Sequence, residues 1–318
     1  MGTMCALLLA RRGTHVTLWG VSPEHVAVLR RDRENKRHLA GYQFPESLKL
    51  VSDPSGAFDD PALIVSAVPC QYMRSVWRSF ADHVPRDVPV LSVAKGIEIG
   101  TLLRPTAIIE DCVGEVSVGC LSGPCLAPEV AAEKPASVVV AFEDPASATL
   151  VQAGFSTDFL RVYTSNDLIG VELAGALKNV IALAAGISDG IDAGDNAKAA
   201  LVTRGLVEIT RLGVALGASR DTFRGLAGMG DLFTSCASSI GRNRTAGERI
   251  GRGATVDEVL ASTPSIIEGI PTTRSVLELA ARHNVEMPIV SGVASVLFEG
   301  RRPYDCIVEL MRRRLRSE

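Results

Sequence analysis

The first twenty residues, "MGTMCALLLARRGTHVTLWG" (residues 1–20), decide how the N-terminal half of the chain is interpreted. Residues 1–12 contain the small and apolar residues of a helix, Gly13 supplies a helix stop, and residues 15–20 alternate like a short β-strand. A helix and a second strand are thus present without a first strand. If Gly2 is the last glycine of a G-x-G-x-x-G turn, the strand and the two glycines that should precede it are absent from this sequence. We therefore expect Met1 to be an internal methionine and the natural chain to be longer by about a dozen residues, the length of one strand and its turn.

Length and composition indicate a protein with a large core. The chain has 318 residues, of which 47% are hydrophobic and 22% charged, and we expect two domains because single cores stop growing near roughly 250–300 residues. The net charge of −3 provides no general field for nucleic acid or anionic lipid, so neither is expected as a partner. The seven cysteines form no C-x-x-C pair, which favours reduced thiols over a disulfide framework or a metal site.

No targeting segment is expected. The N-terminus lacks a charged region followed by an apolar core and a small-residue cleavage site. Apolar runs such as residues 179–186 are too short to span a bilayer. These features predict a cytoplasmic protein without a membrane partner.

The pattern of the chain changes near residue 165. Before it, short β-branched runs alternate with helical stretches, and several read as near-continuous apolar strands, which is typical of strands buried on both faces of a parallel sheet. After it, long runs of Ala, Leu, Gly and Val at helical spacing replace the strands. We predict an α/β fold with a Rossmann-like, doubly wound sheet that lacks its first strand over residues 1–164, and an all-helical domain over residues 165–318. The predicted strands lie in residues 14–19, 48–53, 62–69, 88–96, 116–124, 136–142 and 160–165.

Loops that follow strands are the first places to look for a ligand, because ligands of doubly wound sheets bind beyond the carboxyl ends of the strands. Lys95 follows an apolar strand and precedes a glycine, so it is either a phosphate or carbonyl ligand or a solvated lysine at a strand end. In "SGPCLAPE" (residues 122–129), Gly123 begins a loop that either presents backbone N–H groups to an anion or is only a tight turn. Neither loop decides the function alone.

Lys178 is a stronger candidate. It lies in "ELAGALKNVIALAAG" (residues 172–186), where almost all neighbours are small or aliphatic, so packing gives no reason for a lysine. Burial lowers the pKa of a lysine toward the range useful for acid–base chemistry. The alternative is a lysine that reaches the surface along its methylene stem. The adjacent Asn179 adds a second polar group and favours a catalytic role.

A glycine-rich stretch adds further polar candidates. Residues 225–253, "GLAGMGDLFTSCASSIGRNRTAGERIGRG", contain a carboxylate, Asp231, and a guanidinium, Arg242, that suits phosphate. Alone, this stretch is equally typical of a flexible surface loop with helix caps. Its combination with Lys178 favours a site.

Taken together, several motifs strongly resemble the bacterial-type NAD(P)-dependent sn-glycerol-3-phosphate dehydrogenase family, in order from Gly2 to about residue 300. Several motifs in register are far more specific than a lone G-x-G-x-x-G. They are "VAKGIE" (93–98), "LSGPCLAPE" (121–129), "GVELAGALKNVIALAAGISDG" (170–190), "DNAKAALVTRGL" (195–206), "GLAGMGDLFTSC" (225–236), "GRNR" (241–244) and "IIEG" (266–269).

The resemblance implies a reaction and a set of residues. Lys178 matches the family's acid–base lysine, which protonates the carbonyl oxygen of dihydroxyacetone phosphate during reduction and removes the alcohol proton of sn-glycerol 3-phosphate in reverse. The product would serve phospholipid synthesis. The implied substrate contacts are Lys95, Gly123, Cys125, Lys178, Asp231, Gly241, Arg242 and Asn243, and the implied cofactor contacts are Met1, Gly2, Val21, Lys95, Ala127, Arg242, Ile266 and Glu268.

The resemblance suggests a homodimer, and the cysteine pattern gives no reason to expect a metal. The sequence also departs from the family at several positions. Cys125 stands where Ser or Thr is common, Ser235 where Thr is usual and Gly241 where Ser is frequent. Val21 and Ser22 stand where a strict NAD enzyme usually places Asp or Glu against the ribose diol. We therefore expect NADP to be tolerated, without excluding NAD.

Two alternatives remain open. A related two-domain reductase of the hydroxy-acid or ketopantoate type would share the architecture but should lack the ordered Gly-Asp-Leu, Arg-Asn-Arg and Glu-Gly motifs. A non-catalytic relic that lost its cofactor site with its first strand would fail to bind NADPH.

Overall fold

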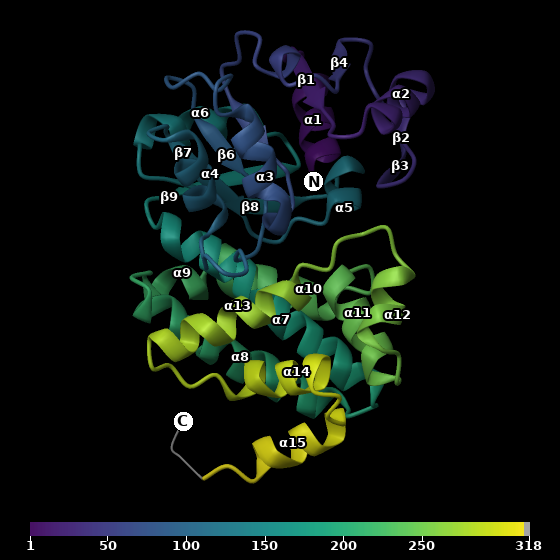
Figure 1. The fold of residues 1–318 in the computed structure, drawn as a ribbon, viewed down its shortest axis with the longest axis vertical. Coiled ribbons are helices and arrows are strands. Elements are labelled where there is room, and N and C mark those ends of the chain that lie inside the picture. The colour runs from purple at the N-terminus through teal and green to yellow at the C-terminus, as the bar shows by residue number, and fades with distance from the viewer. Residues whose placement is uncertain (315–318) are drawn as a thin grey trace. The chain divides into compact units, whose positions relative to one another are not determined.

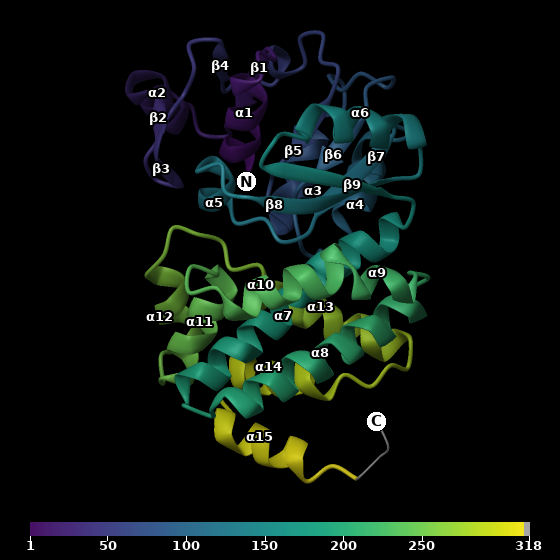
Figure 2. The same ribbon diagram turned by 180° about the vertical axis from the view of Figure 1, so that it is seen from behind.

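The computed structural model describes residues 1–314, which form two compact units (Figures 1 and 2). Unit 1 comprises residues 1–94 and 105–171, and unit 2 comprises residues 95–104 together with the chain from Glu172 onward. The domain boundary expected between residues 164 and 165 stays a prediction. The compact units divide the chain differently, because the short segment 95–104 is bonded to the helices of unit 2.

All seven predicted strands form in unit 1. Their apolar, β-branched residues pack in a buried core, as expected for strands covered on both faces. In the described residues they form two separate sheets rather than one. A parallel pair contains β1 (Val16–Trp19) and β4 (Leu48–Val51), and a five-stranded sheet contains, in order, β5 (Ile64–Ser66), β6 (Val90–Ser92), β7 (Val118–Ser122), β8 (Ala136–Phe142) and β9 (Leu160–Ser165).

The expectation of a parallel sheet is wrong at one place. β7 and β8 pair antiparallel, whereas β5, β6 and β7 are mutually parallel, as are β8 and β9. The connection from β7 to β8 contains only the five-residue helix α5 (Ala127–Ala131), which is too short to return the chain to the starting end of β7. β8 therefore runs back beside β7.

A small hairpin in unit 1 was not predicted. β2 (Glu34–Asn35) pairs antiparallel with β3 (Leu39–Gln43). The buried carboxylate of Glu34 accepts hydrogen bonds from Gly41 N at 2.7 Å and Gln43 Nε2 at 3.0 Å. Polar bonds rather than an apolar pattern thus hold this hairpin.

Helices pack around these sheets. α1 (Gly2–Arg11) lies within the helix predicted over residues 1–12 and is one residue shorter at each end, and Gly13 has a φ of +82° after its last turn. α1 buries Leu7 and Leu8 in the core that also contains Val138 and Val140 of β8. The helices of unit 1 besides α5 are α1 (Gly2–Arg11), α2 (Pro23–Asp32), α3 (Cys70–Phe80), α4 (Pro105–Val113) and α6 (Pro145–Phe155), with a 3₁₀ turn η1 (Ser55–Ala57).

The described part of unit 2 contains helices and no strand, which confirms the predicted change of pattern. Figures 1 and 2 both show α7 running through the middle of these helices. The elements are α7 (Leu168–Gly190), α8 (Asp195–Ala215), α9 (Arg220–Arg224), a π-helical turn η2 (Leu226–Gly230), α10 (Asp231–Ala237), α11 (Arg242–Gly251), α12 (Val256–Ala261), α13 (Gly269–Arg282), α14 (Pro288–Phe298) and α15 (Pro303–Met311).

α7 is long enough and apolar enough to cross a membrane by length and composition, in contrast to the expectation from the shorter run at residues 179–186. The helix has 23 residues because the apolar pattern continues on the N-terminal side of Lys178. However, 94% of its most apolar window is buried inside the protein. α7 is thus buried in the manner of a core helix.

Candidate active site

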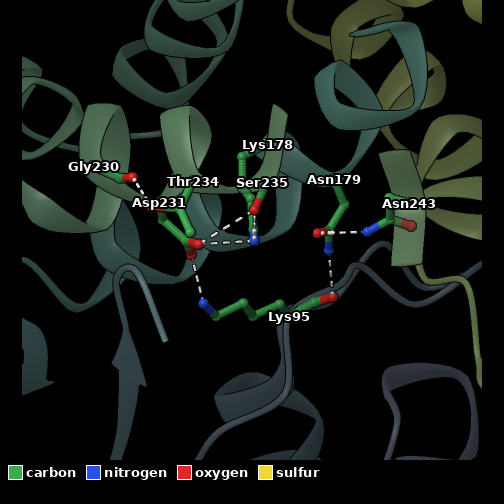
Figure 3. Close-up of polar contacts among 8 residues, drawn as sticks. All are labelled: Lys95, Lys178, Asn179, Gly230, Asp231, Thr234, Ser235 and Asn243. Carbon is green, nitrogen blue, oxygen red and sulfur yellow. Dashed lines mark hydrogen bonds and ion pairs between the residues drawn. The ribbon is translucent and has the colours of Figure 1, made fainter. Parts of the chain in front are cut away.

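Asp231 binds two lysines inside unit 2 (Figure 3). The Nζ atom of Lys178, in the middle of α7, lies 2.9 Å from Asp231 Oδ1, and the Nζ atom of Lys95 lies 2.5 Å from Oδ2. Lys178 also donates a hydrogen bond of 2.5 Å to the hydroxyl of Ser235, one turn after Asp231 on α10. The structure therefore brings together three residues predicted from the sequence and adds Ser235.

Burial and charge determine the protonation behaviour of this cluster. Asp231 and Lys178 are only 2% and 7% exposed. Burial lowers the pKa of Lys178 from its ordinary value, the ammonium of Lys95 lowers it further, and the carboxylate of Asp231 opposes both. Burial alone would raise the pKa of Asp231, but the two ammonium groups outweigh it and lower that pKa. The cluster thus contains an ionised carboxylate beside an amine that releases its proton more readily than an ordinary lysine.

The glycine-rich residues before Asp231 form a helical turn rather than the flexible surface loop that was the alternative interpretation of this stretch. They make the π-helical turn η2, which leads directly into α10. A Cβ atom on Gly228 would lie 2.2 Å from the backbone oxygen of Phe223. Glycine is therefore required for this turn to fold back on α9 and to place Asp231 at the start of α10.

Asn179 connects Lys95 to the start of α11. Its Nδ2 donates to the backbone oxygen of Lys95 at 3.1 Å, and its Oδ1 accepts from Asn243 Nδ2 at 2.9 Å. Asn243 Oδ1 in turn accepts from the backbone N–H of Gly269 at 3.0 Å. These bonds join segment 95–104, α7, α11 and the start of α13.

The "GRNR" sequence is also helical, so the surface-loop interpretation is wrong. Gly241 is the N-cap residue of α11 and Arg242 its first residue. The exposed Arg242 side chain donates to the backbone oxygen of Ile266 at 3.2 Å. Glu268 is the N-cap residue of α13. The contacts of Gly241, Arg242, Ile266 and Glu268 with a substrate or cofactor stay predictions.

The other predicted cofactor and substrate residues lie in unit 1. Met1 is the N-cap residue of α1 and its side chain makes no capping hydrogen bond. A Cβ atom on Gly2 would lie 3.0 Å from Ala67 Cβ, just after β5. A helix N-terminus with a glycine in its first turn fits a dinucleotide phosphate. Val21 is 73% exposed just after β1.

The loop after β7 requires a glycine. Gly123 has a φ of +114°, and a Cβ atom there would lie 3.1 Å from Val138 Cα. Cys125 and Ala127 are half-buried and pack against the core of unit 1. Gly123 and Cys125 thus lie in one constrained loop that leads into Ala127 at the start of α5, and the ligand contacts of all three stay predictions.

Two functional features were missed or only partly recognised from the sequence. Ser235 was noted only as a departure from the family, although its spacing of four residues from Asp231 becomes informative once both are placed on a helix. Arg104 forms an ion pair with the buried Glu172 and so fixes the end of segment 95–104 to α7. In residues 1–314, no group of three or more His, Cys, Asp or Glu side chains is arranged to hold a metal ion.

Comparison with known proteins agrees with this geometry. The family model for the N-terminus of NAD-dependent glycerol-3-phosphate dehydrogenase matches residues 1–148, and the family model for its C-terminus matches residues 167–308. The chain belongs to this glycerol-3-phosphate dehydrogenase family. Among its family relatives, a glycerol-3-phosphate dehydrogenase [NAD(P)+] from Citrifermentans bemidjiense is 43% identical over 320 aligned residues, which cover 100% of this chain and 96% of the relative.

Solved structures show the same relationship. A crystal structure of glycerol-3-phosphate dehydrogenase from Coxiella burnetii matches this member of the family with a TM-score of 0.94 and 36% identity, over 98% of this chain and 95% of the other. A ketopantoate reductase from Ralstonia eutropha matches with a TM-score of 0.59 and 14% identity, over 97% and 95% of the two chains. The similarity to the ketopantoate reductase shows a shared fold alone, because the sequence identity is so low.

Proposed function

We propose that the chain catalyses reversible hydride transfer between NAD(P)H and dihydroxyacetone phosphate to give sn-glycerol 3-phosphate, with Lys178 as the acid–base residue. The observation that carries the assignment to Lys178 is its burial beside Asp231 and Ser235. A buried lysine with a lowered pKa suits proton transfer near neutral pH. Membership of the family supports the identity of the substrate.

Lys178 would act at the carbonyl oxygen of the substrate. Reduction of a ketone builds negative charge on that oxygen, so an ammonium aimed at it stabilises the transition state and then donates its proton from Nζ. In the reverse direction the neutral amine removes the alcohol proton. Bound NADPH or NADH supplies the hydride, and the oxidised cofactor accepts it in reverse.

Asp231, Ser235 and Lys95 would orient this amine. Asp231 and Ser235 accept two of the hydrogen bonds that Lys178 can donate, which leaves one N–H for the substrate. Lys95 occupies the other oxygen of Asp231 and adds a second positive charge close to the forming oxyanion. The cluster thus holds one proton donor in a fixed direction.

The start of α11 would bind the substrate phosphate. Arg242 supplies an exposed guanidinium and Asn243 an amide held by Asn179 and Gly269. Arginine forms two parallel hydrogen bonds to a phosphate. Binding energy from this remote group positions the carbonyl for reaction without acting on the reacting carbon.

The cofactor would be held by unit 1. The N-terminus of α1 fits its phosphates, and the absence of an acidic side chain at Val21 and Ser22 favours acceptance of NADP as well as NAD. Ser22 instead caps α2 by accepting from His25 N. Phospholipid synthesis as the use of the product, a cytoplasmic location and a homodimeric state stay predictions.

Substitution of Lys178 by methionine tests the proposal. Lys178→Met keeps the length and apolar bulk of the side chain but removes the proton donor. We expect kcat for dihydroxyacetone phosphate reduction to fall by roughly 10²–10⁴, while NADPH affinity and the melting temperature remain close to the wild-type values. Near-normal kcat would show that Lys178 is only a tolerated core lysine.

A matched control is Lys198→Met, because Lys198 also pairs with one aspartate of unit 2, Asp189, at 2.9 Å. We expect its kcat to stay within about threefold of the wild type, since a partly exposed ion pair contributes little. Preference of the wild type for 2-keto acids over dihydroxyacetone phosphate would favour the ketopantoate-type alternative. Failure to bind NADPH would favour the non-catalytic one.

A further inference from the structure

α7 and α11 cross with their backbones in direct contact. Each helix contributes two glycines spaced four residues apart, which places both on one face of the helix. Glycine in a helix interior is unfavourable relative to alanine. Four glycines where two helices cross therefore indicate that the two backbones must approach closely. They are Gly186 and Gly190 of α7 and Gly247 and Gly251 of α11.

No side chain fits at this crossing. A Cβ atom on Gly247 would lie 2.1 Å from Leu183 O, and one on Gly251 would lie 2.4 Å from Ile187 O, whereas ordinary contact begins at 3.4 Å. The blocking atoms are backbone oxygens within α7, which cannot rotate aside as a flexible side chain can. An alanine at residue 247 would therefore force the helices apart by about one ångström.

The crossing adjoins the residues that hold the start of α11. Leu183 lies one turn after Asn179 on α7, and Gly247 lies one turn after Asn243 on α11. The contact between Gly247 and Leu183 thus lies one helical turn along α7 and α11 from the 2.9 Å hydrogen bond between Asn243 and Asn179. A separation of about one ångström would lengthen that bond beyond hydrogen-bonding distance.

We infer that Gly247 is a positioning residue for phosphate recognition. Its missing side chain sets how closely α11 packs on α7 and hence where Asn243 and Arg242 meet the substrate phosphate. This inference rests on the proposed function, which assigns phosphate binding to those two residues. Gly247 itself would not contact the substrate, because it faces Leu183 and is buried.

The test is Gly247→Ala with steady-state kinetics. We expect KM for dihydroxyacetone phosphate to rise by about tenfold or more, the fold-change of one lost hydrogen bond to a charged group, while kcat and KM for NADPH change less than about threefold. The control is Gly292→Ala in α14, where the added Cβ lies 3.7 Å from Cys306 Cβ, an ordinary contact. This control should leave both KM values unchanged.

A double-mutant cycle separates positioning from general loosening of unit 2. Asn243→Ala should raise KM for dihydroxyacetone phosphate, and adding Gly247→Ala to it should raise KM little further. An Asn243→Ala variant with normal KM would contradict the phosphate assignment in the proposed function. A raised KM for Asn243→Ala combined with a normal KM for Gly247→Ala, or with an undiminished effect of Gly247→Ala in the double variant, would overturn the positioning role.

If Gly247→Ala does not fold, Gly251→Ala takes its place in the cycle. Its Cβ meets Ile187 O one turn further from Asn243, so we expect a smaller rise in the same KM. A folded Gly251→Ala enzyme with an unchanged KM would overturn the inference.

Discussion

Lys178 and Asp231 form a buried pair in which Nζ of the lysine lies 2.9 Å from Oδ1 of the carboxylate. The other carboxylate oxygen is taken by Lys95, so one negative charge faces two positive charges. The net positive charge suits a reaction that builds negative charge on a substrate oxygen. The same arrangement makes the pKa of Lys178 dependent on both neighbours, in opposite directions.

The pH dependence of ketone reduction should therefore respond to each neighbour. Reduction requires protonated Lys178, so kcat falls as pH rises through the pKa of Lys178, which lies below the ordinary lysine value of 10.5. Asp231→Asn removes a charge that raises this pKa, and we expect the alkaline limb of the kcat profile to move to lower pH. We also expect kcat at neutral pH to fall by about tenfold or more, because the amine is less well oriented.

Lys95→Met is the matched comparison for the pH profile. It removes an ammonium that lowers the pKa of Lys178, so the alkaline limb should move to higher pH. Profiles of kcat from pH 6 to 10.5 for the three proteins would measure both shifts. Displacement of the two variants in the same direction would contradict the assignment of the limb to Lys178.

Arg242→Ala tests phosphate recognition at the start of α11. A bidentate contact between guanidinium and phosphate contributes roughly 1.5–3 kcal/mol, so KM for the substrate or for the cofactor should rise by roughly 10–100-fold. A larger effect with NADPH than with NADH would assign the contact to the cofactor. Arg249→Ala on the same helix is the control, since the Arg249 side chain donates to Ser262 Oγ and belongs to none of the predicted contacts with substrate or cofactor. Equal kinetics of both variants would make Arg242 an ordinary surface residue.

The sequence predicted strands well where burial dominated and poorly where polar bonds did. The apolar runs of unit 1 each became a strand, because β-branched residues fill a core covered on both faces. The β2–β3 hairpin depends on Glu34, which accepts hydrogen bonds from Gly41 and Gln43. Polar contacts of this kind produce no hydrophobic pattern in the sequence, so the hairpin was not predicted. The antiparallel direction of β8 depends on the brevity of α5, which periodicity does not encode.

The candidate site could be predicted only in part for a similar reason. Lys178 stood out because a charged residue interrupts an apolar helix. Its partners Asp231 and Ser235 lie 53 and 57 residues away in the sequence. Asp231 was a candidate from the glycine-rich stretch and again from the resemblance, but neither indicated that it bonds Lys178 directly. The contact of Ser235 with Lys178 was missed because the preceding glycine-rich stretch was not expected to be helical. Close packing against Phe223 makes that stretch a π-helical turn, which leads into the helix that carries Ser235.

The stability of unit 2 should depend on a second buried carboxylate, which lies outside the candidate site. Glu208 of α8 is 4% exposed and accepts hydrogen bonds from the N–H groups at the start of α14, from Ile289 at 2.9 and 3.1 Å and from Val290 at 3.4 Å. Burial raises its pKa to about 7, although those N–H groups oppose the shift. A folded pKa above the unfolded value means that the stability contribution of Glu208 is complete below about pH 4.5 and is lost as pH rises through about 7.

Glu208→Gln should therefore flatten the pH dependence of the melting temperature between pH 5 and 8, because glutamine keeps an acceptor oxygen for α14 and carries no charge at any pH. Glu208→Ala should lower the melting temperature throughout this range, since two buried N–H groups lose their partner at a cost of about 1–3 kcal/mol. The control is Glu258→Gln at the exposed start of α12, where hydrogen bonds from Thr255 lower the pKa of Glu258, so that its titration falls below this range. Thermal unfolding of the four proteins across the range measures the slopes, and parallel curves for the wild type and Glu208→Gln would show that Glu208 does not titrate between pH 5 and 8.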